Sequence, residues 1–113
     1  MILGIGIDRC TIARMEAVHG TFGPRLLSRL LTSTEQAQKE WTAAALARRW
    51  ACKEAVAKAL GTGIGEAFGF QDIEITYSAK GAPQCHVASA EGTMHISVSD
   101  DDGVAIAYAV WER

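Results

Sequence analysis

Residues 43–60 read AAALARRWACKEAVAKAL, and the segment GTG follows at residues 61–63. Alanine fills much of this stretch, and its few large apolar side chains are spread widely around the axis that a helix would have. A helix that is apolar on nearly all sides is usually buried. Glycine often follows the last helical residue, because it adopts the left-handed conformation without steric cost. We therefore expect a long, buried helix over residues 43–60 that ends at Gly61.

Charged side chains interrupt this apolar helix. Trp50, Glu54, Lys58 and Gly61 follow one another at steps of three or four residues, so they form one stripe that ends at the glycine segment. A carboxylate in such a setting needs a cation partner, because burying an unpaired charge is costly. Two interpretations are open. Glu54 and Lys58 form a pair on a solvated face, worth about 0.3 kcal/mol, or they belong to a functional site.

The start of the chain favours the functional interpretation. Residues 2–7 alternate as a strand, with apolar side chains on one face and a bare face formed by Gly4 and Gly6 on the other. The two glycines allow another element to approach closely. Asp8 follows on the bare face, so Asp8 and Glu54 are expected to share one site.

Two carboxylates that share a site repel each other unless one is protonated or a hard cation lies between them. Oxygen ligands completed by water and phosphate suit Mg²⁺. Asp8 and Glu54 are therefore candidate Mg²⁺ ligands. Lys58 and the backbone amides of residues 61–63 would then meet phosphate oxygens.

The rest of the chain predicts helices followed by strands. Three helices are expected before residue 43: one that Thr11 caps and Gly20 ends, one over 26–31 that Pro24 opens, and one toward Trp41 that the capping-box pair Thr32 and Glu35 begins. Four strands are expected after residue 70: 71–77 with Ile73, Ile75 and Tyr77 inward, 84–88, 94–99, and 104–111, the last two joined by a turn at Asp102-Gly103. This order predicts a single α+β domain over residues 1–113, with the N-terminal strand and helices packed on an antiparallel sheet. The first strand must join that sheet from far away in sequence, and the alanine face of the last strand is expected to pack on a neighbouring copy.

Composition narrows the class of protein. The 113 residues fit one domain with one core. A net charge of −2 argues against a nucleic-acid partner, and no run is long enough to span a membrane. Met1–Asp8 does not resemble a signal peptide. Three cysteines without CxxC spacing predict neither a disulfide framework nor a zinc site, so we expect reduced thiols in a cytoplasmic protein.

Several segments also match a known family, in order along the chain. They are Gly4-Ile5-Gly6-Ile7-Asp8, Ile12-Ala13-Arg14, Leu31-Thr32-x-x-Glu35, Arg49-Trp50-Ala51-Cys52-Lys53-Glu54-Ala55-x-x-Lys58-Ala59-Leu60-Gly61-Thr62-Gly63, Gly81-x-Pro83 and His95-x-Ser97. The Lys-Glu-Ala-x-x-Lys block is the most specific of these. The sequence resembles the holo-acyl-carrier-protein synthases, whose fold is called 4'-phosphopantetheinyl transferase-like.

The resemblance implies a function. Such an enzyme transfers the 4'-phosphopantetheine group from coenzyme A to a serine of apo-acyl-carrier protein and releases 3',5'-ADP, with Mg²⁺ as cofactor. It also implies a homotrimer with active sites at the subunit interfaces. Because the reaction is a phosphoryl transfer, positioning and charge neutralisation should dominate catalysis.

The resemblance assigns roles to individual residues. Asp8 and Glu54 would hold the metal and, with Lys58, form the catalytic set, in which Glu54 accepts the serine proton directly or through a water. The cofactor would be bound by Arg49, Lys53, Lys58, Gly61, Gly63, Pro83 and His95. Arg14 and Arg25 would form the docking patch for the carrier protein.

The sequence departs from the family pattern in four places. Arg9-Cys10-Thr11 follows Asp8, where an apolar pair and an acid are usual, and Ala82 replaces a lysine. Residues 89–93 are too few for a helix that the family has there. Asp100 replaces the second histidine of a terminal His-x-Ser-x-x-His motif, and we expect it to weaken the contact with the 3'-phosphate of coenzyme A.

Alternatives remain for both the function and the single residues. A small metal-dependent phosphohydrolase would use the same two carboxylates, and an inactive homologue would bind carrier protein without transfer. His95 and Ser97 also suit plain strand positions, Trp50 suits core packing, and Arg25 with Arg29 suits a solvated helix face.

Overall fold

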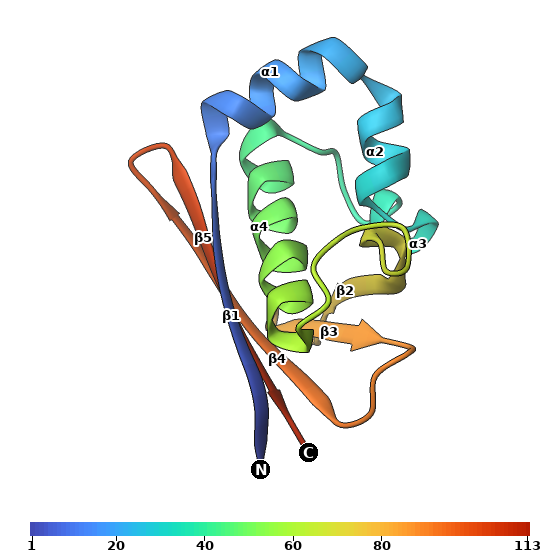
Figure 1. Cartoon of the computed structure of the whole chain (residues 1–113). Coiled ribbons are helices and arrows are strands. Elements are labelled where there is room, and N and C mark those ends of the chain that lie inside the picture. The colour runs from blue at the N-terminus through green and yellow to red at the C-terminus, as the bar shows by residue number, and fades with distance from the viewer.

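The computed structural model describes all 113 residues. Its helices pack on a curved sheet (Figure 1). The elements in chain order are β1 (Ile2–Thr11), α1 (Ile12–Phe22), α2 (Pro24–Leu30), α3 (Ser33–Gln36), α4 (Ala43–Leu60), the 3-10 turn η1 (Phe70–Asp72), β2 (Ile73–Tyr77), β3 (Pro83–Val87), β4 (Thr93–Asp101) and β5 (Val104–Glu112). This arrangement confirms the predicted α+β class.

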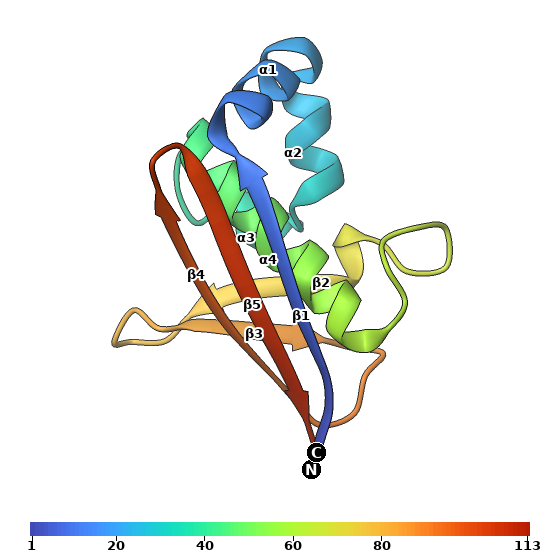
Figure 2. The ribbon, with the colours of Figure 1, turned by 60° about the vertical axis from the view of Figure 1, so that its left-hand side comes forward.

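The five strands form one sheet in the order β1-β5-β4-β3-β2, with every neighbouring pair antiparallel. β1 lies at one edge, beside β5 from the other end of the chain, so that Gly6 faces Ala109 and Asp8 faces Ala107. Figure 2 shows the two termini side by side at one end of this strand pair. The expectation that the first strand joins the sheet from far away in sequence is confirmed.

Helix α4 runs along one face of the sheet, under β1 and β5, and forms the centre of the protein. The side chain of Thr42 caps its start by accepting a hydrogen bond from the amide of Ala45, at 3.2 Å. Gly61 ends it in the left-handed conformation, with φ 78°. Most of its side chains are buried, as the near-continuous alanine predicts.

The glycines of β1 explain why α4 lies so close to that strand. A Cβ atom at Gly6 would lie 1.9 Å from the carbonyl oxygen of Ala55, and one at Gly4 equally close to that of Ala59. No side chain fits into this space, so only a bare strand face can rest against the helix backbone. The predicted close approach is confirmed.

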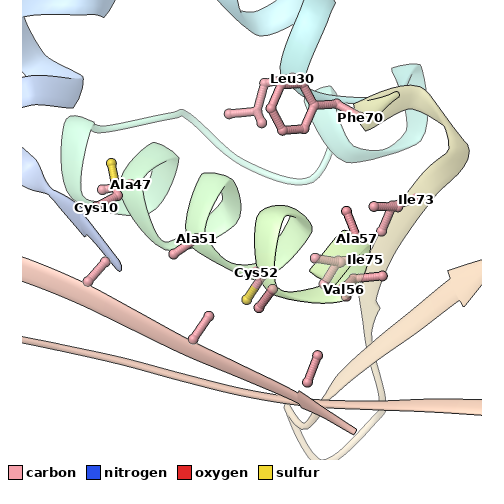
Figure 3. Close-up of a cluster of buried hydrophobic side chains, with 14 of the residues drawn as sticks. Cys10, Leu30, Ala47, Ala51, Cys52, Val56, Ala57, Phe70, Ile73 and Ile75 are labelled. Atoms are coloured by element: carbon pink, nitrogen blue, oxygen red, sulfur yellow. The ribbon is translucent and has the colours of Figure 1, made fainter. Parts of the chain in front are cut away.

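The core lies between α4 and the sheet, with small side chains toward the sheet and larger ones beside α2 and β2 (Figure 3). The alanine face of β5 belongs to this core: Ala105, Ala107 and Ala109 are fully buried within the chain. The expectation that this face packs on a neighbouring copy is therefore wrong. The opposite face of the β1–β5 pair carries the exposed apolar side chains, namely Leu3, Ile5, Ile7, Ile106 and Tyr108.

Smaller differences follow from local geometry. Helix α1 continues to Phe22 and ends at Gly23, whose φ is 54°, whereas Gly20 is simply a helical residue. The capping box of α3 is present, but its helix is a single turn that ends long before Trp41. Tyr77 lies near the end of β2 and is exposed, although Ile73 and Ile75 point inward as expected.

The predicted β4–β5 hairpin is present, with both turn residues, Asp102 and Gly103, at positive φ. Residues 88–92 form no helix. No helix in the structure has both the length and the apolar character needed to cross a membrane.

Candidate active site

Asp8 and Glu54 lie in one neighbourhood where β1 crosses α4. Asp8 lies on the same face of β1 as Gly4 and Gly6, and its side chain is mostly buried. Glu54 lies on α4 and is half-buried. The pKa of Glu54 is raised, first by burial and then by the negative charge of Asp8, while the charges of Lys58 and Arg14 act in the opposite direction. Lys58, one helical turn after Glu54, bonds Asp8 directly, so the two carboxylates lie in the same region, and that they share one metal stays a prediction.

Lys58 supplies the compensating positive charge. Its ammonium donates to a carboxylate oxygen of Asp8 at 3.0 Å and to the carbonyl of Ile7 at 3.0 Å. Lys58 therefore pairs with Asp8 across the strand, and the alternative of a Glu54–Lys58 pair along the helix is not what the structure shows. With 53% of its side chain exposed, Lys58 is free to move toward a ligand.

The two carboxylates provide the only protein ligands that a metal would find here. No group of three or more His, Cys, Asp or Glu side chains is placed to hold an ion. Mg²⁺ accepts such an arrangement, because it usually binds one or two carboxylates and completes its shell with water and phosphate oxygens. The donor set therefore fits Mg²⁺ and does not fit an ion that needs a full protein cage.

The glycine segment after α4 differs from its predicted role. The amides of Thr62 and Gly63 both donate to the carbonyl of Ala57, at 3.1 and 3.2 Å, and the amide of Gly61 donates to Lys58. These bonds satisfy carbonyls at the end of the helix. The expectation that these amides meet phosphate oxygens is therefore wrong, although Gly61 and Gly63 still border open space that a ligand can enter.

Arg49 and Lys53, both predicted to bind the cofactor, pair with the buried carboxylate of Glu35. Lys53 is completely buried, and its ammonium donates to Glu35, Leu30 and Phe70 at 2.6, 2.7 and 2.9 Å. Arg49 is 3% exposed and donates to Glu35 at 2.7 Å. Lys53 therefore does not reach a ligand without disrupting the core, and its assignment to the cofactor is wrong. Arg49 also lines a narrow recess beside Pro83, so its contact with the cofactor stays a prediction.

Glu35 is the residue that sequence reasoning missed. Its carboxylate accepts from Lys53 and Arg49 and from the backbone amides of Thr32 and Ile75. The capping-box pattern found Glu35 but explained it only as a helix cap. Two cations, spaced four residues apart in a helix that is otherwise buried, were the signal that a buried anion had to exist.

Pro83 and His95 lie apart from the carboxylates within one chain. Pro83 begins β3 and borders a narrow recess with Arg48 and Tyr77. His95 lies on the exposed side of β4 and pairs with Glu112, at 2.6 Å between Nε2 and Oε1. The structure therefore does not bring these two predicted residues to the site of Asp8 and Glu54.

Asp100 is a strand residue and not the beginning of the turn. It lies in β4 and pairs with Arg48 of α4, at 2.6 Å, with both side chains about one-third exposed. The negative charge that replaces the family's histidine is thus partly neutralised within the chain.

Arg25 lines an apolar groove on the helical side of the molecule, and Arg14 lies beside Trp50, which forms part of the groove wall. The groove has a volume of about 390 Å³ and is lined by Val18, Phe22, Arg25, Leu26, Arg29 and Trp50. The Arg14 guanidinium lies 6.0 Å from the centre of the Trp50 ring, and that of Arg25 lies 5.5 Å from the Phe22 ring. The Trp50 ring also packs against Phe70, with ring centres 4.8 Å apart and the ring planes tilted by 48°, so Trp50 contacts the core and forms part of the groove wall.

Comparisons with known proteins agree with this arrangement. The model of the 4'-phosphopantetheinyl transferase superfamily matches residues 4–109. A holo-[acyl-carrier-protein] synthase of Alkalilimnicola ehrlichii is 40% identical over an alignment of 125 residues, which covers 99% of this chain and 98% of the relative. That alignment is longer than the 113 residues here, so the relative has residues that this chain lacks.

Solved structures give the same result. The synthase of Neisseria meningitidis superposes with a TM-score of 0.89 at 34% identity, over 100% of both chains. The synthase of Helicobacter pylori, in complex with coenzyme A, has a TM-score of 0.89 at 35% identity, over 96% of this chain and 99% of that one. The chain belongs to the 4'-phosphopantetheinyl transferase superfamily and, within it, to the holo-acyl-carrier-protein synthases.

Proposed function

We propose that this protein transfers the 4'-phosphopantetheine group of coenzyme A to a serine of an apo-acyl-carrier protein and releases 3',5'-ADP. Asp8, Glu54 and Lys58 carry this proposal, because the fold brings two carboxylates and a half-exposed ammonium together in a family named for that reaction. The Helicobacter pylori relative, which binds coenzyme A, has the same fold over nearly the whole chain.

The chemistry is a displacement at phosphorus. The serine hydroxyl oxygen forms a bond to the phosphorus that carries the pantetheine arm, and the bond from that phosphorus to the bridging oxygen breaks. The electron pair leaves with the phosphate of 3',5'-ADP. Mg²⁺ on Asp8 and Glu54 would neutralise charge on the pyrophosphate. Lys58 would turn from Asp8 to a phosphate oxygen.

Glu54 is the candidate acceptor of the serine proton. Burial and the charge of Asp8 raise the pKa of its carboxyl group above the usual value for glutamate. A base with a raised pKa takes a proton more readily once it is ionised. The same carboxylate thus suits both contact with the metal and acceptance of the proton.

Incubation with coenzyme A, Mg²⁺ and apo-acyl-carrier protein tests the proposed function. Mass spectrometry should show the carrier gaining the mass of one phosphopantetheine arm, with release of an equal amount of 3',5'-ADP. Release of 3',5'-ADP without a change in the carrier would identify a phosphohydrolase. Binding of the carrier with no product in any condition would identify an inactive homologue.

A homotrimer is the second part of the proposal. The exposed apolar face of the β1–β5 pair needs a cover, and a shallow depression on it is bordered by Ile5, Ile7, Tyr108 and Lys58. Because Lys58 lies at the rim of this face, a neighbouring copy packed there would complete the active site. Residues that are separate within one chain, such as His95, would then reach the carboxylates of a neighbour.

Light scattering should therefore give three times the mass of one chain. Ile5→Glu should lower that mass and the transfer rate together, because it places a charge on the apolar face. Lys80→Glu, in the β2–β3 turn, is the matched control that should leave the mass unchanged. A native protein that is a monomer at assay concentration would refute this part of the proposal.

Arg14 and Arg25 are proposed to guide an acidic carrier protein to the groove. Charge reversal of both residues should raise the KM for the carrier about 10-fold at low salt and leave coenzyme A binding unchanged, because exposed charges steer association and are screened by salt. Steady-state kinetics at two ionic strengths measures this effect, with Lys80→Glu as the control. A carrier KM that stays the same in the double reversal would contradict the assignment.

Asp100 is proposed to weaken the contact with the 3'-phosphate of coenzyme A and to occupy Arg48 at the same time. Asp100→His should tighten coenzyme A binding about fivefold to tenfold, since it removes a negative charge and frees Arg48. Binding of 3'-dephospho-coenzyme A should hardly change. Calorimetry with both cofactors separates the outcomes, and equal effects on the two would mean that Asp100 does not face the phosphate.

A further inference from the structure

The buried ion pair of Glu35 and Lys53 holds α4 on the side of the helix that faces away from the edge strand β1. Lys53 binds the carbonyl of Leu30 at the end of α2 and that of Phe70 in η1, so one ammonium joins three separate elements to the helix. Burial lowers the pKa of Lys53, and the hydrogen bond to Glu35 acts in the opposite direction. Each of the three donors of this ammonium has an acceptor.

The place of Lys53 on α4 determines where Glu54 lies relative to the ion pair. Successive helical residues are about 100° apart around the axis. Lys53 and Ala55 therefore lie on nearly opposite sides of α4, about 200° apart, and Glu54 lies between them. Ala55 is the residue whose carbonyl meets Gly6. The helix is thus held at β1 on one side and by Lys53 on the other, with the carboxylate of the active site in between.

Contact with β1 alone would leave α4 able to roll about its own axis. The glycine face meets α4 at Ala55 and Ala59, and most of the buried side chains of α4, which also packs on β5, β4 and α1, are alanines with few projections that resist rolling. A side-chain group about 6 Å from the helix axis moves about 1 Å when the helix rolls by about 10°. A misplacement of about 1 Å at a reacting group can lower a rate about 100-fold.

We propose that Glu35 and Lys53 are positioning residues, which fix the rotation of α4 and thereby the place of Glu54 relative to Asp8. The proposal rests on the function proposed above, in which Glu54 contacts the metal and the serine proton. Hydrogen bonds from Lys53 to two backbone carbonyls and to an anchored carboxylate are directional, whereas apolar contacts are not. The pair therefore supplies the resistance to rolling that alanine lacks.

A stability role alone is a weaker explanation. Replacing a buried ion pair by apolar side chains of similar size is often neutral or even stabilising. Glu35 would also need neither Lys53 nor Arg49 if its task were only to cap the short α3, because an exposed glutamate at that position forms the same capping box. The buried charges are explained by the orientation that they impose.

Lys53→Met tests the proposal, because methionine keeps much of the volume and removes the donors. In the variant, the crystal structure should show Glu54 displaced by about 1 Å relative to Gly6. The kcat should fall about 100-fold, with the KM for coenzyme A and for the carrier within about twofold of the native values. Mn²⁺ affinity, measured by electron paramagnetic resonance without substrates, should weaken about 10-fold.

Three further variants keep the test decisive. Glu35→Gln is milder, because its amide oxygen can still accept from Lys53, and it should move the same three quantities in the same direction; it replaces Lys53→Met if that variant does not fold. Val87→Ala lowers stability from β3, outside the ion pair, and should leave kcat per folded molecule and Mn²⁺ affinity unchanged. The double variant Lys53→Met with Glu35→Gln should lose less than the sum of the single losses, since both changes act on the same contact.

The outcomes separate this proposal from the proposed function. A Lys53→Met or Glu35→Gln protein with Glu54 in its native place, native kcat and native Mn²⁺ affinity would overturn the positioning role and leave stability as the only role of the pair. If the native protein transferred nothing, the proposed function would fail, and the position of Glu54 in the variant structures would still decide whether the ion pair fixes α4.

Discussion

Asp8→Asn and Glu54→Gln should each lower phosphopantetheine transfer by a factor of about 10² to 10³ or more, while the protein stays folded. Each change removes one of the two negative ligands that the site offers to a divalent cation, and electrostatic groups of this kind typically contribute that much to a rate. The amides keep the size and shape of the acids. The loss therefore reports charge and metal contact and not packing.

Glu54→Gln should keep or increase the stability of the protein, although it lowers the transfer rate. The folded state raises the pKa of this carboxyl group, mainly by burial, so the folded chain disfavours its ionised form relative to the unfolded chain. This cost is present above the raised pKa, including at neutral pH, and Gln removes it. Thermal denaturation of Glu54→Gln should accordingly show a melting temperature equal to or above that of the native protein.

Glu66→Gln, which changes an exposed carboxylate in the loop after α4, is the matched control and should keep native activity. Mass-spectrometric rates at several Mg²⁺ concentrations and Mn²⁺ binding give two independent measures. A near-normal rate in either Asp8→Asn or Glu54→Gln would show that the two carboxylates do not form one metal site.

Gly6→Ala should cost at least about 3 kcal/mol of unfolding free energy, near the upper end of what overpacking does. The added methyl group would meet the carbonyl oxygen of Ala55, which is part of the helix backbone and has no rotamer to escape into. Either β1 moves away from α4 or the helix shifts. Both responses also separate Asp8 from Glu54, so activity should fall with stability.

Gly20→Ala is the matched control for this change. Gly20 lies within α1, and nothing surrounds the place of the added methyl group. Alanine is favoured over glycine in a helix by about 1 kcal/mol, so this variant should be more stable than the native protein. Urea denaturation followed by circular dichroism compares the two. If Gly6→Ala unfolded at the native urea concentration, β1 would not pack on α4 as described.

The sequence alone predicted the elements whose local pattern is strong. The alanine-rich run 43–60 with its terminal glycine identified α4 within one residue, and the alternation of β1 with its two glycines predicted which face meets the helix. Proximity of Asp8 and Glu54 followed from those two facts. These predictions depended on the local sequence pattern and on one packing rule, that a bare glycine face lets another element approach closely.

The parts that failed depend on contacts between distant segments. Lys53 looks like a ligand-binding cation until Glu35 is brought against it, and nothing in the helix itself says that this happens. The alanine face of β5 was assigned to a neighbouring copy because the sequence does not reveal that α4 already covers it. The backbone amides after Gly61 were assigned to phosphate because their bonds to α4 are set by the geometry of the helix end.

The pairing of β1 with β5 also determines when the site forms during synthesis. β5 is the only strand neighbour of β1, and about 90 residues separate the two strands in the chain. Closing so long a loop is entropically unfavourable and slow, and until it closes the backbone of β1 has no strand to bond. A nascent chain that stops before Val104 can already contain α4 with Glu54 in place, yet Asp8 is not held beside it. Translation thus delays the assembly of the carboxylate pair until β5 has been made, and chains without β5 should not hold Asp8 beside Glu54.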